Sequence, residues 1–443
     1  MKEIVKDNRV QEVERVFQLQ KQSQWKLKNT SANERIALLE KLREALEHYG
    51  EEIDEALFLD LGRPKTSQEL NGVLEDINYT IQHLEQWMTP EVKRYEKIPS
   101  ATYYVQYEPK GVTLLFGSWN APINLIFSPL VALLSAGNTV IIRPSGESKH
   151  CSAVIAKVIK RAFDEQFVAV FEGRSDLANE MLKLPFDHVF FTGSPPVGRE
   201  IMEKASKHLA SVTLELGGRC PLIFDETASI EALIQSIGFA KIYNSGQICL
   251  SINHVFAPAS KLQELVEGLK QFFEASCYEN GEYKPERVGR IINEKNFNRI
   301  VGYVQDAVDK GAEVAFGGSS DIKSLTIEPT ILTNTPLNSD AVNNEIFGPV
   351  LPIITYENVE EVIDYINTDG KPLGLYVFSH NDEFISQILN NTSSGGVTIN
   401  GWALHGSIHD LPFGGANESG IGKYHGVHGF YELSNAKAVF KTF

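Results

Sequence analysis

The chain has 443 residues, of which 42% are hydrophobic and 22% are charged, a balance typical of a globular protein rather than a disordered or fibrous one. This length exceeds that of one ordinary domain, so we expect two or three. The 57 acidic and 41 basic side chains give a formal net charge of -16, which argues against nucleic acid or an anionic membrane surface as a partner.

The sequence contains no segment typical of export or membrane insertion. Residues 1–17 mix charged and apolar side chains and lack the apolar core of a signal peptide. The longest apolar run, Ile123 to Ala136, is shorter than the roughly 20 residues that span a bilayer. The cysteines are widely spaced and form no Cys-x-x-Cys pair; they are Cys151, Cys220, Cys249 and Cys277. We therefore expect reduced thiols, a cytoplasmic location, no membrane anchor and no metal site.

The N-terminal region has the pattern of an amphipathic helix. Ser31 followed by Glu34 forms a capping box, and apolar residues then recur at helical spacing from Leu39 to Ile53. We expect one helix there.

From Gly111 onward, short apolar runs alternate with stretches long enough for helices. The runs are Val112 to Phe116, Thr139 to Ile142, Val168 to Phe171 and Val189 to Phe191. This alternation predicts a doubly wound parallel sheet. Ligands bind at the carboxyl ends of the strands in such sheets, and the pattern is compatible with a nucleotide without requiring one.

A second alternating region follows Glu215 and contains helical stretches at Lys261 to Phe273 and Asn296 to Lys310. This region predicts a second α/β domain. A glycine-rich segment from Leu411 to Gly422 marks its end, and we expect an arm after that segment.

One cysteine stands in a context that suits a nucleophile. The segment Asn244 to Cys249 places the thiol of Cys249 just after a glycine turn, where it is exposed and its backbone N–H is free. A single cysteine is more often a small buried hydrophobic residue. The context alone therefore leaves both interpretations open.

Two further residues suit roles beside such a nucleophile. Glu215 stands between apolar residues before a glycine pair, where desolvation raises the pKa of a carboxyl group toward the range of a general base. Asn120 follows the first strong strand and offers an N–H to a developing oxyanion. The alternatives are a strand-end salt bridge for Glu215 and a turn asparagine for Asn120.

Taken together, these motifs give a sequence that resembles the aldehyde dehydrogenase superfamily, and within it the class 3 branch, over essentially its whole length. The matching motifs stand in the family's order: Phe191 to Ser194 with Gly198, Leu214 to Gly218, Asn244 to Cys249, Glu345 to Pro349, and Leu411 to Gly415 with Ser419 and Gly420. The class 3 features are the run Lys371 to Phe378 and the segment Tyr424 to Gly426. Because the motifs occur together and in the family's order, they outweigh the alternative interpretations given above for Cys249, Glu215 and Asn120.

The resemblance implies an α/β fold with a Rossmann-like coenzyme domain, an α/β catalytic domain and a small β-arm for oligomerisation. We expect residues 1–85 and 108–214 in the coenzyme domain, 215–412 in the catalytic domain, and 86–107 with 430–443 in the arm. Class 3 members are typically dimers, so a homodimer is implied.

The resemblance also implies roles for individual residues. Cys249 would be the nucleophile, Glu215 the base that activates water, and Asn120 the oxyanion donor together with the N–H of Cys249. The residues implied in binding NAD or NADP are Arg143, Ser145, Gly193, Ser194, Glu345 and Phe347, of which Glu345 would hold the nicotinamide ribose. A helix that begins at Ser194 would suit the pyrophosphate.

This chain departs from the family pattern at the adenosine ribose. The family usually has Lys-Pro-Ser-Glu where this chain reads Arg143-Pro144-Ser145-Gly146. Gly146 lacks the carboxylate that repels a 2'-phosphate, and Arg143 offers donors suited to phosphate if it points into the site. We therefore expect NADP to be accepted as well as NAD. An inward-turned Glu147, or an arginine held elsewhere, would oppose this.

Two other departures concern the catalytic side. Arg219-Cys220 replaces the usual Lys-Ser or Lys-Asn, and Ser251 to Asn253 replaces Ala-Pro-Asp, which leaves the choice of aldehyde open. Trp119 and Trp402 are candidates either for an apolar substrate pocket or for the core.

The implied reaction is oxidation of an aldehyde to a carboxylic acid. Cys249 forms a thiohemiacetal, hydride leaves to NAD(P)+, and water hydrolyses the resulting thioester. Glu215 favours hydrolysis over transfer of the acyl group to coenzyme A. The alternative is a family member with an impaired coenzyme site that serves as a binding or structural protein, which only the changes at Arg143 and Gly146 support.

Overall fold

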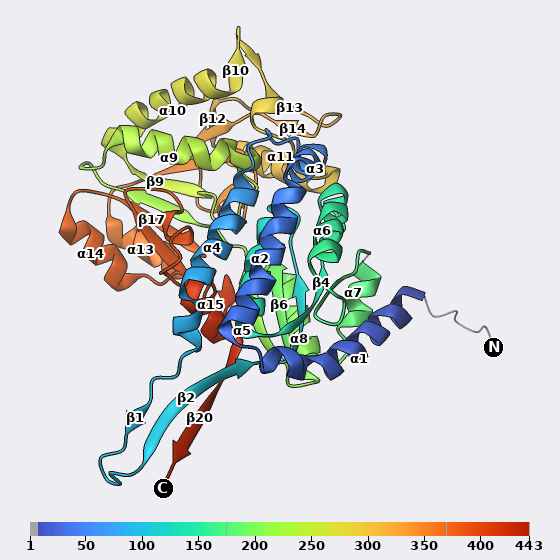
Figure 1. Cartoon of the computed structure of the whole chain (residues 1–443). Coiled ribbons are helices and arrows are strands. Elements are labelled where there is room, and N and C mark those ends of the chain that lie inside the picture. Colours follow the sequence, from blue (N-terminus) through green and yellow to red (C-terminus); the bar gives the residue numbers. More distant parts are fainter. Residues whose placement is uncertain (1–7, 174, 369, 443) are drawn as a thin grey trace.

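The computed structural model describes residues 8–173, 175–368 and 370–442. It consists of two open β-sheets covered by helices and a protruding arm (Figure 1). Residues 1–7 of the expected coenzyme domain lie outside the described residues.

The first sheet has six strands in the order β19-β7-β6-β3-β4-β5. All but β19 run parallel, which confirms the predicted doubly wound sheet. The strands are β3 (Val112–Phe116), β4 (Thr139–Arg143), β5 (Val168–Val170), β6 (His188–Gly193), β7 (Ser211–Leu216) and β19 (Gly420–Ile421). Because β19 pairs antiparallel with β7 and Gly420 lies opposite Glu215, a C-terminal segment closes this sheet beside the expected base.

Helices cover both faces of the first sheet, as the burial of every residue of β3 requires. Leu114 packs in a core with α1 (Asn8–Lys28), α7 (Ser175–Met181) and α8 (Pro195–Ser206). Leu115 points the other way, into a core with α2 (Ala32–His48), α3 (Gly50–Leu61), α4 (Gln68–Met88), α5 (Asn124–Ala136), α6 (Lys149–Ala162) and α15 (Gly426–Glu432). Each face therefore has its own hydrophobic core.

The expected single helix from Leu39 to Ile53 is wrong: the chain forms α2 and α3 there, separated at Tyr49. The N–H of Tyr49 donates to the carbonyls of Ala45 and Glu47 and ends α2, and α3 begins at Gly50. A Cβ at residue 50 would lie only 3.2 Å from Leu70, so close packing favours glycine at the break. The predicted capping box of Ser31 and Glu34 is present.

The second sheet has seven strands in the order β12-β15-β16-β9-β8-β17-β18. They are β8 (Pro221–Phe224), β9 (His254–Pro258), β12 (Glu313–Phe316), β15 (Thr330–Thr333), β16 (Val350–Tyr356), β17 (Gly374–Phe378) and β18 (Gly396–Ile399). One face packs against α9 (Ile230–Ile242) and α10 (Leu262–Cys277), and the other against α13 (Val359–Thr368) and α14 (Asp382–Asn391). At its edge lie α11 (Glu294–Asp309) and α12 (Asp340–Asn343).

Short elements complete this half of the molecule. They are the hairpins β10 (Tyr278–Glu279) with β11 (Glu282–Tyr283) and β13 (Ser320–Asp321) with β14 (Thr326–Ile327), and the 3-10 turns η1 (Tyr243–Gly246), η2 (Ala259–Lys261), η3 (Pro285–Arg287) and η4 (Leu404–Gly406).

The arm is a three-stranded antiparallel sheet that projects from the body, with the C-terminus at its end (Figure 1). It consists of β1 (Lys93–Arg94), β2 (Thr102–Pro109) and β20 (Ser434–Lys441). The expected arm segment 430–443 begins inside α15 and continues as β20. Among the described helices, none is both long and apolar enough to cross a bilayer.

Candidate active site

The cysteine singled out by the sequence lies on a sharply turned loop after α9. Asn244 and Ser245 adopt a positive φ of 52°, and Gly246 follows with a φ of 69°. A Cβ on Gly246 would lie 2.3 Å from the carbonyl oxygen of Gly348, so this turn requires glycine. Cys249 is partly exposed, whereas the other three cysteines are buried, as expected for core residues.

Hydrogen bonds lock Asn120 to this loop. The Nδ2 of Asn120 donates to the Gln247 carbonyl at 3.1 Å, and the Nδ2 of Asn244 donates to the Asn120 carbonyl at 2.8 Å. The Nε2 of Gln247 in turn donates to the carbonyls of Asn244 and Arg290, at 3.0 and 2.9 Å. The asparagine, the glutamine and the cysteine of the motif therefore form one rigid unit.

The residue after the nucleophile is also held in place. The Leu250 carbonyl accepts bonds from the Tyr376 hydroxyl at 2.6 Å and from the Trp402 indole Nε1 at 2.7 Å. The Cys220 thiol donates to the Cys249 carbonyl at 3.2 Å. Trp402 thus supports the loop from the core. Trp119 contacts the ring of Phe347 edge to face, with centroids 5.4 Å apart.

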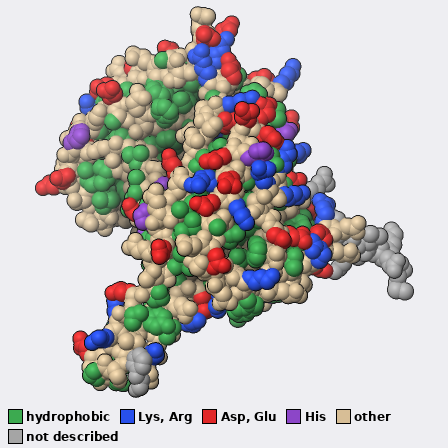
Figure 2. Space-filling view, viewed as in Figure 1, with side chains coloured by type: hydrophobic (Ala, Val, Ile, Leu, Met, Phe, Trp, Pro, Cys, Tyr) green, Lys and Arg blue, Asp and Glu red, His purple; other side chains and the backbone are tan. Residues whose placement is uncertain are grey.

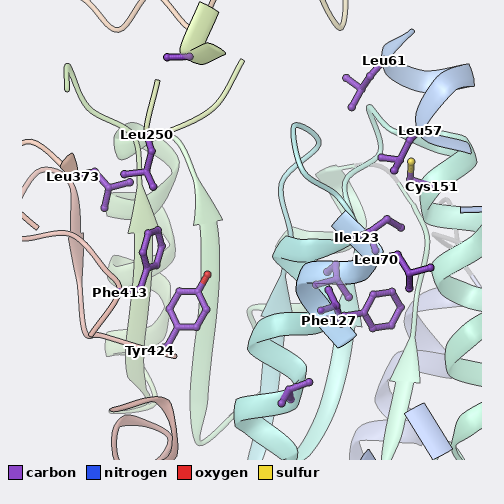
Figure 3. Close-up of a cluster of buried hydrophobic side chains, with 14 of the residues drawn as sticks. Leu57, Leu61, Leu70, Ile123, Phe127, Cys151, Leu250, Leu373, Phe413 and Tyr424 are labelled. Carbon is purple, nitrogen blue, oxygen red and sulfur yellow. The ribbon is translucent and has the colours of Figure 1, made fainter. Parts of the chain in front are cut away.

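Cys249 and Asn120 line one cavity of about 280 Å³. Figure 3 shows Phe413 and Tyr424 side by side on one of its walls, with Leu250 nearby; all three line the cavity. Glu75, Asp76 and His409 lie on its α4 side, and the imidazole of His409 contacts Asp76 at 2.8 Å. The cavity is therefore mostly apolar around the thiol and polar where α4 borders it. Neither Trp119 nor Trp402 lines it.

The surroundings of Cys249 favour its neutral thiol at rest. Burial among the surrounding residues raises the pKa of Cys249, although part of the residue reaches the surface. Cys220, Glu345 and Glu215 raise it further, which also shows that these groups lie near the thiol. A base must therefore take the proton when the sulfur attacks a substrate.

Glu215 lies in β7, near its carboxyl end, with only 3% of its surface exposed. Both carboxylate oxygens are buried and have no hydrogen-bond partner in the described part of the chain. Burial raises the pKa of Glu215 well above its usual range, while the charge of Lys423 lowers it and that of Glu432 raises it. The neutral form of this carboxyl group is therefore favoured at rest, which is the protonation behaviour expected of a desolvated acid–base residue.

The coenzyme-side residues come from both sheets. The register of β3, β4 and β6 places Arg143 and Gly193 at the same edge, and α8 begins just after Ser194. Glu345 precedes β16 and accepts the Gly218 N–H at 3.1 Å. Burial raises the pKa of Glu345 to about 7, although the Gly218 N–H opposes the shift.

This edge suits a nicotinamide dinucleotide. The N-cap residue Ser194 makes no side-chain cap, and because Pro195 and Pro196 carry no N–H, the backbone N–H of Val197 is the first that α8 offers to a phosphate. Three buried polar atoms near the strand ends have no partner among the described residues: Thr192 Oγ1, Arg143 Nε and Ser148 Oγ. Buried polar groups usually have a partner, and the phosphate or ribose oxygens of a bound coenzyme would provide acceptors for these three.

The structure also places the residues that the sequence analysis expects to influence coenzyme choice. The guanidinium of Arg143 donates to the carbonyls of Gly173 and Pro144, at 3.0 and 3.1 Å. Glu147 accepts from Asn293 Nδ2 at 2.9 Å. Ser145 is buried and bonds to the Glu147 N–H at 3.3 Å.

Three contributors to this site were not predicted from the sequence: Lys423, Glu69 and the pair of Asp76 with His409. Lys423 stands within the Gly-rich C-terminal segment, where its positive charge among glycines was the one available signal. Glu69 and Asp76 lie on α4, far from any motif, and only the packing of α4 against α5 brings them to the site.

A sequence model of the aldehyde dehydrogenase family matches residues 4–439. The chain belongs to the aldehyde dehydrogenase family. The protein AldX of Bacillus subtilis (strain 168) is 42% identical to this dehydrogenase over 445 residues, which cover 99% of each chain. An enzyme of Canis lupus familiaris named "aldehyde dehydrogenase, dimeric NADP-preferring" is 37% identical over 408 residues, 91% of this chain and 89% of that one.

A solved structure, the substrate-bound state of Staphylococcus aureus AldH, matches this dehydrogenase with a TM-score of 0.93 at 34% identity. The match covers 97% of this chain and 94% of that one. These findings confirm the predicted family, its class 3 character and the predicted fold. The protein is an NAD(P)-dependent aldehyde dehydrogenase, which oxidises an aldehyde to a carboxylic acid.

Proposed function

We propose that Cys249, Asn120 and Glu215 carry the oxidation in this dehydrogenase, with Cys249 as nucleophile, Asn120 as oxyanion donor and Glu215 as the base for hydrolysis. The arrangement of Cys249 and Asn120 on one cavity, joined through the Gln247 carbonyl, carries the proposal. The buried carboxyl of Glu215, near enough to affect the thiol, supports it.

In the proposed mechanism a base, either Glu215 or a water molecule, takes the proton of the Cys249 thiol, and the sulfur attacks the aldehyde carbon. One N–H of the Asn120 amide and the backbone N–H of Cys249 donate to the oxygen that becomes negative. A bound nicotinamide coenzyme supplies the acceptor for the hydride. The thioester left on Cys249 is then attacked by a water whose proton Glu215 removes, which releases the acid and restores the thiol.

Replacing each cysteine by serine in turn tests the nucleophile. Cys249→Ser is expected to lose dehydrogenase activity by at least about a thousandfold, as removal of a covalent nucleophile does. The other three serine variants are expected to keep activity if they fold. Substantial activity in folded Cys249→Ser would reject the assignment.

Glu215→Gln tests the base. If Glu215 acts mainly on water, the variant is expected to give a burst of reduced coenzyme followed by slow turnover, with acyl-enzyme visible by intact-mass spectrometry. Unchanged steady-state turnover would reject this role. Loss of the burst would mean that Glu215 also takes the thiol proton.

For the coenzyme, we propose that Glu345 holds the nicotinamide ribose and that Phe347 lies beside the nicotinamide. Gly193 and Ser194 receive the pyrophosphate in this proposal. Arg143 and Ser145 border the adenosine ribose. We further propose that NADP is accepted beside NAD. Gly146 carries no repelling carboxylate, and Glu147 is directed to Asn293, whereas the bonds of Arg143 to the carbonyls of Gly173 and Pro144 oppose a contact between its guanidinium group and a 2'-phosphate. The name of the canine relative, which states NADP preference, supports acceptance of NADP.

The ratio of kcat/KM for NADP and NAD tests coenzyme choice in the parent and in Gly146→Glu. A Cβ at residue 146 would lie 3.1 Å from the Gly173 carbonyl, so Gly146→Ala serves as the steric control. The glutamate is expected to lower the ratio at least tenfold relative to the alanine variant. Equal ratios would remove residue 146 from coenzyme selection.

We also propose a homodimer formed through the arm, and a cytoplasmic location. The arm carries a groove of about 670 Å³ lined largely by aromatic and apolar residues, and Figure 2 shows hydrophobic side chains on the projecting arm. A catalytic thiol requires a reducing compartment, which supports the location. The six-stranded sheet would form the coenzyme domain and the seven-stranded sheet the catalytic domain, although β7 crosses the expected boundary at residue 215 and β19 lies beyond residue 412.

A further inference from the structure

Lys423 lies on a short antiparallel connection that wraps around Glu215. Phe413 and Tyr424 exchange both backbone hydrogen bonds, at 2.8 and 2.7 Å, which fixes Gly414 and Lys423 next to each other. On the other side, β19 pairs with β7 so that Gly420 lies opposite Glu215. The segment from residue 413 to 424 therefore encloses the carboxyl end of β7.

Gly414 forms the contact between the lysine and the carboxyl group. A Cβ built at residue 414 would lie 2.7 Å from Glu215 Oε1 and 3.1 Å from Lys423 Cδ. The ammonium of Lys423 donates to the Gly414 carbonyl and, at 3.2 Å, to the Gly395 carbonyl. Backbone without a side chain thus separates a half-buried ammonium group from a buried carboxyl group.

The charges that face Glu215 come from few groups. Lys423 is the cation whose charge acts on Glu215 among the described residues, and Glu432, which accepts from Thr213 Oγ1 at 2.9 Å, acts against it. Cys249 and Tyr424 also lie within reach of its charge, and both are neutral when protonated. A buried carboxylate without a countercharge is strongly disfavoured.

We propose that Lys423 is a positioning residue for the hydrolytic step: its ammonium group, held on the Gly414 carbonyl, is the countercharge that lets Glu215 ionise and take a proton from water. The proposal rests on the role of Glu215 proposed above. Lys423 itself does not line the cavity that contains Cys249. It bonds backbone carbonyls while Glu215 is neutral, and its charge stabilises the carboxylate once the proton has left.

Two substitutions separate the charge of Lys423 from its hydrogen bonds. Lys423→Gln keeps N–H donors for the two carbonyls and removes the charge, whereas Lys423→Arg keeps both. Each variant is acylated on Cys249 with a p-nitrophenyl ester, and decay of the acyl-enzyme is followed by intact-mass spectrometry across a range of pH. This measures hydrolysis without hydride transfer.

Removing a positive charge near a carboxyl group raises its pKa, so the midpoint of the pH profile is expected to move up by about one unit in Lys423→Gln. Below the midpoint, decay then slows about tenfold. Lys423→Arg is expected to keep the parental midpoint. A role limited to holding the loop would lower the rate at every pH and leave the midpoint in place.

An unmoved midpoint in Lys423→Gln, or an equal shift in Lys423→Arg, would overturn the proposal. If Lys423→Gln does not fold, Lys423→Ser, which leaves room for water on the carbonyls, is expected to show the same shift. Glu215→Gln identifies failure of the underlying role: a pH-dependent decay that persists in this variant means that Glu215 is not the base. If decay in Glu215→Gln no longer depends on pH but the midpoint in Lys423→Gln is unmoved, the role of Glu215 stands and only the proposed role of Lys423 is rejected.

Discussion

Gly414 shows, at the scale of a single residue, how closely backbone approaches the catalytic carboxyl. Its φ is 149°, and a Cβ there would meet the Gly422 carbonyl at 2.6 Å and Glu215 Oε1 at 2.7 Å. We expect Gly414→Ala to displace Glu215 and slow acyl-enzyme hydrolysis at least tenfold, since displacement of about 1 Å costs that much or more. Gly302→Ala, where a Cβ meets nothing within 4 Å, is the control and is expected to keep parental rates.

The raised pKa of Glu345 predicts how coenzyme binding depends on pH. Burial raises the pKa of Glu345 to about 7, so the carboxyl is largely protonated below that pH and charged above it. A carboxylate accepts ribose hydroxyls more strongly than a neutral acid. Affinity for NAD+, measured by quenching of tryptophan fluorescence, is therefore expected to rise as pH increases through about 7.

In Glu345→Gln the affinity for NAD+ is expected to be weaker and independent of pH over the same range. A parental affinity that does not change with pH, or a variant that keeps the parental dependence, would contradict the proposed role of Glu345. NAD+ is used because the 2'-phosphate of NADP titrates in the same region.

The residues proposed to act directly on the substrate stand within sequence motifs, whereas Lys423, proposed to act on Glu215, was not singled out by any motif. Cys249, Asn120 and Glu215 stood in motifs whose spacing reflects local turns. The charge of Lys423 acts on Glu215 only because residues 413 and 424 pair. No local sequence pattern predicts which residue this pairing places next to β7. Likewise, the bonds of Arg143 to backbone carbonyls depend on where residue 173 lies.

At the scale of elements, the start of α5 depends on a buried ion pair from α4. Glu69 is bound by Arg63 and accepts the N–H groups of Ile123 and Asn124, at 3.0 and 3.2 Å. The side chains of Arg63 and Glu69 are 4% and 3% exposed. Since Asn120 lies shortly before α5, Glu69 also supports the segment that carries the proposed oxyanion donor.

Glu69→Gln leaves the buried Arg63 charge without its partner, and we expect it to reduce the free energy of unfolding by about 3–5 kcal/mol. Urea denaturation provides the measurement, with Glu52→Gln as control. Glu52 pairs with Lys157 at the surface, where both side chains are about half exposed, so a loss below about 1 kcal/mol is expected. Equal losses in the two variants would show that burial does not decide the effect.

Helices and strands were predictable where the spacing of the hydrophobic residues and the length of the segment indicated the same type of element. The runs at Val112 and Thr139 became β3 and β4, and the stretches from Lys261 and Asn296 became α10 and α11 within a few residues. The boundary between α2 and α3 was not predictable from spacing, because the apolar period continues through Tyr49 while packing against Leu70 sets the break. The two residues of β19 are too few to show any period.

At the scale of the whole molecule, the arm predicts the oligomeric state. Val105 and Phe440 are 43% and 52% exposed on the arm, which is a large exposure for apolar side chains on a projecting sheet. Val105→Asp is expected to convert the dimer to a monomer in analytical ultracentrifugation. Leu389→Asp, on an exposed part of α14, is the control and is expected to stay dimeric. A parental monomer, or a dimeric Val105→Asp, would count against an interface at this groove.

The pairing of β19 with β7 and of β20 with β2 has a consequence for synthesis of the enzyme. While the ribosome still covers the last residues, a nascent chain already carries Cys249 but lacks the strand beside Glu215 and the partner of β2. Contacts between residues so far apart in sequence form late in folding. We expect chains that stop before Gly420 to be inactive and rapidly degraded by added protease, so that a reactive thiol meets aldehydes only in completed molecules.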